Sequence, residues 1–79
     1  MLINRVKYLH DYILELELNT GETITNDFRD FLFSETNPMT TRYRDIRLFK
    51  KVKLKNHILS WNDYEMCFDY NHLPNLTSI

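Results

Sequence analysis

The stretch KVKLKNHILSW, residues 51–61, constrains the fold of this chain most. It begins with a strict alternation of lysines and apolar residues, which is typical of a half-buried strand. A second apolar run follows after a two-residue interval. If that interval forms a tight turn, Leu54 lies opposite Leu59, and the same register places Val52 opposite Trp61. We therefore predict a β-hairpin whose four apolar side chains, the indole of Trp61 included, share one buried face.

Period-2 patterns also predict three strands near the beginning of the chain, at residues 2–9, 13–18 and 22–26. An odd-length turn after the first strand would place Tyr8 opposite Leu14. The second turn would be of type I with Gly21 in the left-handed conformation, which places Ile24 opposite Leu16. The three strands would then form an antiparallel meander with one apolar face.

The apolar period becomes helical between these two groups of strands. Three residues show the spacing i, i+3, i+4: Phe28, Phe31 and Leu32. They predict a short helix, with Asn26 or Asp27 as its N-cap. We expect a second helix over residues 42–49, capped by Thr41, with an apolar stripe that includes Tyr43. In this helix the three arginines would point away from the stripe.

These elements predict an α+β fold in which a small antiparallel sheet, a three-stranded meander plus a second hairpin, carries one or two short helices. We expect a single domain over residues 1–79, because a chain of this length supports only one core. The lone Cys67 excludes an internal disulfide and is typical of a reducing compartment. No segment approaches the roughly 20 apolar residues of a membrane helix. We therefore expect a cytoplasmic protein without membrane association.

The centre of the chain is basic and both flanks are acidic. Residues 42–55 have a net charge of +6, against −4 for residues 1–41 and −3 for residues 56–79. The candidate contact residues in the centre are Arg42, Arg44, Arg47, Lys51, Lys53 and Lys55. They would contact nucleic acid or an acidic protein, or the lysines would pair with Glu15 and Glu17 on the outer face of the same sheet. We expect the pairing, since solvated surface charge is the commoner outcome.

The sequence shows no catalytic or cofactor signature. Cys67, Asp69 and His72 lie close together but are too few to indicate a metal site, so we expect no metal and no cofactor. We therefore predict that the chain is not an enzyme. Tyr64 and Tyr70 are the aromatic candidates for a binding surface, because aromatic residues are enriched at interface hot spots.

Two further patterns indicate a family. The first is V-x-Y-L-H-D-Y-x-L-x-L-x-x-x-x-G-E over residues 6–22, and the second is the spacing of Leu48-Phe49, Val52, Leu59-Ser60-Trp61 and Leu73. Together they resemble the uncharacterised bacterial domain-of-unknown-function family 2442. The resemblance implies a small α+β domain. Members of the family are in some cases joined to a helix-turn-helix domain, and others are encoded beside a small protein as a suggested toxin–antitoxin pair.

The resemblance implies no catalytic residue, and the chain departs from the common pattern after Trp61. Many members have Pro and Gly there, whereas this chain has the residues 62–65, NDYE. Our leading hypothesis is a non-catalytic interaction domain that binds a protein partner, in the manner of an antitoxin. The alternative is a nucleic-acid-associated accessory protein that uses the basic segment 42–55.

Overall fold

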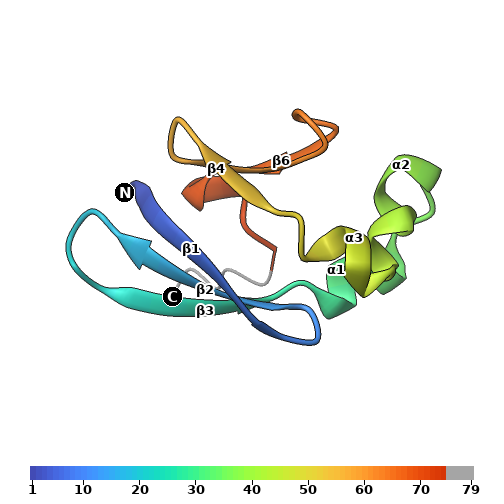
Figure 1. Ribbon diagram of the computed structural model, residues 1–79, viewed down its shortest axis with the longest axis horizontal. Helices are drawn as coiled ribbons and strands as arrows, with labels where there is room; N and C mark the ends of the chain where they lie inside the picture. The colour runs from blue at the N-terminus through green and yellow to red at the C-terminus, as the bar shows by residue number, and fades with distance from the viewer. Residues whose placement is uncertain (75–79) are drawn as a thin grey trace.

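A computed structural model of the chain describes residues 1–74; residues 75–79, which the predicted domain includes, lie outside this description. Two three-stranded antiparallel sheets are joined by a helical segment (Figure 1). The strands are β1 (Ile3–His10), β2 (Ile13–Leu18), β3 (Thr23–Asp27), β4 (Lys53–Lys55), β5 (Ile58–Trp61) and β6 (Met66–Phe68). The helical elements are α1 (Arg29–Ser34), α2 (Pro38–Thr41), the 3₁₀ turn η1 (Arg42–Arg44), α3 (Ile46–Phe49) and the 3₁₀ turn η2 (Tyr70–His72).

The first sheet is the predicted meander, in the order β1-β2-β3. Tyr8 pairs with Leu14 on the neighbouring strand, as the alternation predicted. Leu16 pairs with Ile24 on the other side. These pairs confirm the predicted register. It is the favourable one because a one-residue slip would turn every leucine of β2 toward solvent.

The first turn differs from the prediction, and the second does not. His10 pairs with Ile13, so only two residues form the turn, and the register shifts between Tyr8 and His10. We predicted an odd-length turn because the pairing of Tyr8 with Leu14 requires one extra residue. The irregularity in β1 accommodates that residue, so the turn itself can be shorter. Gly21 has the predicted left-handed conformation, with φ of +90°, and its N–H donates to the carbonyl oxygen of Leu18 at 2.9 Å.

The second sheet confirms the predicted hairpin and its register, but β4 begins at Lys53, so Val52, the predicted partner of Trp61, precedes the strand. Leu54 pairs with Leu59 across β4 and β5. The two turn residues, Asn56 and His57, both have positive φ, 51° and 65°. Such a turn matches the right-handed twist of the paired strands and therefore fixes their register.

This sheet also contains a strand that we did not predict. β6 pairs with β5, opposite Leu59, Ser60 and Trp61. Cys67 lies on this edge strand and is exposed. The sheet is therefore three-stranded, and the free thiol lies on its outermost strand.

The single helix expected over residues 42–49 is wrong. The helical conformation is interrupted at Asp45, whose φ and ψ of −76° and 113° are extended. The helix α3 begins after this residue. The Asp45 carboxylate accepts a hydrogen bond from the Arg47 N–H at 3.0 Å, so it caps α3 in place of the predicted Thr41. The N-cap of α1 is Phe28 and not the predicted Asn26 or Asp27, although Oδ1 of Asp27 accepts from the N–H of Arg29 at 2.9 Å.

The core lies between the two sheets and is closed at one end by the helical segment (Figure 1). Its largest fully buried side chains are Trp61, Phe28 and Phe49. The Trp61 Nε1–H donates to the carbonyl oxygen of Phe49 at 2.8 Å, so the buried indole is satisfied. Tyr12 is a core residue that the sequence analysis missed, since it lies in the turn after β1. Within residues 1–74, no helix is long and apolar enough to cross a membrane.

Candidate functional site

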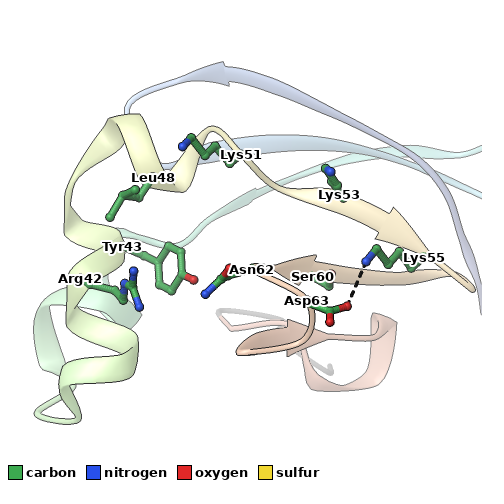
Figure 2. A pocket seen from close by; sticks show the side chains of 9 residues that line it. All are labelled: Arg42, Tyr43, Leu48, Lys51, Lys53, Lys55, Ser60, Asn62 and Asp63. Carbon is green, nitrogen blue, oxygen red and sulfur yellow. Dashed lines mark hydrogen bonds and ion pairs between the residues drawn. The ribbon is translucent and has the colours of Figure 1, made fainter.

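The basic centre of the chain lines a hollow between the helical segment and the second sheet (Figure 2). We call it the basic hollow; its volume is about 440 Å³. Its lining residues are Arg42, Tyr43, Leu48, Lys51, Lys53, Lys55, Ser60, Asn62 and Asp63. Four of these side chains are cationic and one is acidic, so the wall of the hollow is strongly positive.

The alternation of the lysines brings them to one side of β4. Successive side chains of a strand point to opposite faces, so Lys53 and Lys55 share the face opposite Leu54. Lys53 pairs with Ser60 on β5, which places the serine beside it at the floor of the hollow. The Ser60 residue is only 1% exposed, and its hydroxyl forms no hydrogen bond to another residue of the described chain.

Arg42 approaches from the helical segment and is held by a carboxylate. Its Nη1 lies 3.0 Å from both oxygens of Glu65. The hydroxyl of Tyr43 donates to Oε1 of the same carboxylate at 2.7 Å. Glu65 is therefore shared by two residues that lie 22 and 23 positions earlier in the chain. Within residues 1–74 only Nη1 of the guanidinium forms a hydrogen bond, so the N–H groups of Nε and Nη2 remain available to another acceptor.

This arrangement shifts the ionisation of Tyr43. Burial of the ring raises the pKa of Tyr43 to about 12, and the hydrogen bond to Glu65 and the charge of that carboxylate act in the same direction. The nearby guanidinium of Arg42 acts in the opposite direction and is the smaller effect. Tyr43 therefore stays protonated, as a fixed hydrogen-bond donor, at all physiological pH values.

Lys55 is the lysine of the hollow with partners inside the molecule. Its Nζ lies 3.3 Å from Oδ1 of Asp63 and 5.4 Å from the centre of the Tyr64 ring. Lys51 and Lys53 are exposed, and neither forms an ion pair within residues 1–74. Two of the four cations therefore face the hollow without a partner carboxylate.

The loop between β5 and β6 has an uncommon backbone. Asn62, Asp63 and Tyr64 all have left-handed φ, at 50°, 57° and 70°. The N–H of Glu65 closes this turn by donating to the carbonyl oxygen of Trp61 at 3.0 Å. Asn and Asp tolerate the left-handed region, but for the bulky Tyr64 it is strained. Tyr64 is 43% exposed, and its ring lies at the rim of the hollow because its centre is 5.4 Å from Nζ of Lys55, a lining residue.

Three of the predicted contact residues lie outside the hollow. Arg44, which was expected to point away from the apolar stripe, instead turns back to donate to the carbonyl oxygens of Leu32 and Glu35, at 2.7 and 2.9 Å. Arg47 pairs with Asp45 at 2.9 Å. Arg44 therefore satisfies carbonyls at the end of α1, and both arginines have local partners in the helical segment.

The remaining aromatic candidate also lies elsewhere. Tyr70 is half-buried and packs against the core. The structure thus brings together five of the eight predicted residues, four in the wall of the hollow and Tyr64 at its rim.

The pairing expected between the strand lysines and the acids of β2 is wrong. Glu15 lies opposite Lys7 and Glu17 lies opposite Arg5, all within the first sheet. The lysines of β4 belong to the second sheet, so cross-strand pairing with β2 is geometrically excluded. The acids of β2 therefore do not neutralise the cations of the basic hollow.

The residues considered for a metal do not form a cluster. Asp69 accepts from the N–H of His72 at 3.0 Å and contacts its ring, and the hydrogen bond to the ring lowers the pKa of the Asp69 carboxyl. The pair caps the 3₁₀ turn η2. Cys67 lines a second, more open hollow with these residues, but residues 1–74 contain no group of three His, Cys, Asp or Glu side chains placed to hold a metal ion.

Several residues of the site were missed by the sequence analysis. Ser60 and Asn62 carry no charge, and no local pattern connects Glu65 with Arg42 or Tyr43. The one available signal was the dipeptide Asn62-Asp63, since both residue types favour turns. That dipeptide indicates a turn, but Arg42 and Tyr43, which also line the hollow, lie 20 and 19 positions before Asn62.

Fold and site together define a small α+β domain of two stacked antiparallel sheets with a cationic surface hollow. Residues 3–73 match the family described as protein of unknown function (DUF2442), and the chain belongs to that family. Searches of curated proteins and of solved structures found no significant match.

Proposed function

We propose that this chain is a non-catalytic interaction domain that binds an acidic protein partner through the basic hollow. The observation that supports it is the charge of the hollow. Lys51 and Lys53 face it without an ion pair inside the described molecule, and Arg42 offers further N–H groups beside them. Unpaired cations that converge on one concavity attract an acidic group from outside.

The mode of action that we propose is masking. In this role the chain would be a cytoplasmic, antitoxin-like domain. It would cover a functional surface of a small partner protein and thereby inhibit the activity of that protein. The hollow supplies cations and neutral hydrogen-bond donors. We propose that these groups bind the partner and do not take part in catalysis.

The test is co-expression with the product of the neighbouring reading frame, followed by size-exclusion chromatography and calorimetry. We expect a stoichiometric complex that weakens as the salt concentration rises, because its contacts are charged. The double change Lys51→Gln and Lys53→Gln should abolish the complex. The matched control is Lys7→Gln with Arg47→Gln, which removes two exposed cations elsewhere. A complex that both double variants form equally well, or no complex at all, would contradict the proposal.

A second candidate function is binding of nucleic acid, which the same unpaired cations favour. Each phosphate that a cation neutralises releases counterions, so log K against log [salt] would have a slope of about −0.9 per phosphate on duplex DNA. We expect no such binding at physiological ionic strength, since Lys51 and Lys53 are the only lysines of the hollow without an ion pair within residues 1–74, and duplex binding requires several neutralised phosphates. Titration of labelled duplex and single-stranded DNA and RNA at two salt concentrations measures it. Submicromolar, salt-sensitive binding that is lost in the Lys51/Lys53 double variant would place this function first.

A further inference from the structure

The basic hollow already holds carboxylates of its own, and they indicate the chemistry of its ligand. Arg42 binds Glu65 and Lys55 binds Asp63. Both pairs unite a cation of the hollow with a carboxylate of the β5–β6 loop. The remaining cations of the hollow, on the same wall, are without such a partner.

The two internal carboxylates differ in how firmly they are held. The side chain of Glu65 is 15% exposed and accepts hydrogen bonds from two residues. The side chain of Asp63 is 85% exposed and has one contact, at 3.3 Å. An exposed single ion pair is weak, so water or another carboxylate can replace Asp63 at little cost. Glu65 therefore holds Arg42 and Tyr43 from behind the wall, whereas Asp63, which lines the hollow, is an exchangeable partner of Lys55.

We infer that the hollow takes the carboxylates of an extended acidic peptide segment, and that one of them replaces Asp63 at Lys55. This inference rests on the proposed function and names the chemistry of the partner. Lys53 and Lys55 lie two residues apart on a strand, about 6.6 Å along it. Alternate side chains of an extended peptide have the same spacing, so acidic residues at every second position can meet successive lysines.

The experiment uses a fluorescein-labelled peptide of four Glu-Ser repeats and measures its fluorescence anisotropy at low salt. The decisive variant is Asp63→Asn, which removes the internal carboxylate and keeps a residue that tolerates left-handed φ. The matched control is Asp45→Asn, which removes an equal charge and frees Arg47 outside the hollow. We expect Asp63→Asn to tighten binding roughly two- to fivefold and Asp45→Asn to leave it unchanged. Lys53→Gln should weaken it.

The outcomes separate this inference from the proposed function. Equal affinities for the Asp63→Asn and Asp45→Asn variants, or binding that Lys53→Gln does not weaken, would overturn the exchange of carboxylates. The proposed function would still hold if the partner complex is lost in the Lys51/Lys53 double variant. An eight-nucleotide oligothymidine that binds more tightly than the peptide would overturn the preference for carboxylates. Thermal melting of each variant verifies that it is folded.

Discussion

Replacing Trp61 by alanine is expected to lower the free energy of unfolding by about 3–5 kcal/mol. The indole is fully buried, and its ring centre lies 5.7 Å from those of both Phe28 and Phe49. Its Nε1–H also satisfies the carbonyl oxygen of Phe49, which the change would leave without this donor. A domain of 79 residues has a total stability of roughly 4–12 kcal/mol, so the loss would be a large part of it.

Urea denaturation measures this loss, and two variants serve as controls. Trp61→Phe keeps most of the buried ring and removes the N–H, so we expect a smaller loss of about 1–3 kcal/mol. Phe33→Ala truncates an aromatic side chain that is 49% exposed and should cost less than either. A loss below about 1 kcal/mol for Trp61→Ala would mean that the indole does not hold the core together.

The second large effect is an alkaline loss of stability caused by Tyr43. Its pKa is about 12 in the folded protein, against 10.0 for the ordinary side chain. Between these two pH values the unfolded chain releases the phenolic proton and the folded chain keeps it, so stability falls as the pH rises. The slope approaches about 1.4 kcal/mol per pH unit, and the total loss is at most about 3 kcal/mol. Below pH 10 this residue contributes no pH dependence.

Urea midpoints measured between pH 9 and pH 12 provide the test, with Tyr43→Phe as the reference. The phenylalanine variant keeps the buried ring, and its other titrating groups are the same. We expect the two proteins to differ in slope only above pH 10. Parallel curves over the whole range would show that Tyr43 ionises as an ordinary tyrosine, and that Glu65 does not hold its hydroxyl.

The sequence predicts the strands well where two local rules agree. Around Leu54 and Leu59, the alternation of side chains and the length of the turn independently indicate the same register. Asp45 shows where one rule misleads. The apolar spacing around this residue predicts one continuous helix. An aspartate before a helical turn is, however, a strong N-cap, and in the structure Asp45 caps a new helix, α3. β6 was missed because three residues are too few to show a period.

The cations of the candidate site were predictable, but their grouping was not. Lys53 and Lys55 share a face by simple alternation, whereas Lys51 precedes β4, in the turn after α3. The contact of Arg42 with Glu65, in contrast, joins residues 23 positions apart and depends on how the helical segment packs against the second sheet. Arg44 was expected to point away from the apolar stripe of a single helix, although a guanidinium can also satisfy the carbonyls at the end of a helix.

The order of the strands has a consequence for how the chain folds. In both sheets each strand pairs with its neighbour in sequence, so every pairing closes only a short loop. Short loops lose little chain entropy on closure, and contacts that are local in sequence form quickly. The ring Nδ1 of His57, by contrast, lies 3.0 Å from the carbonyl oxygen of Ile3, a contact across 54 positions that joins one sheet to the other. We therefore expect the two meanders to form early and independently, with their docking across the aromatic core as the rate-limiting step.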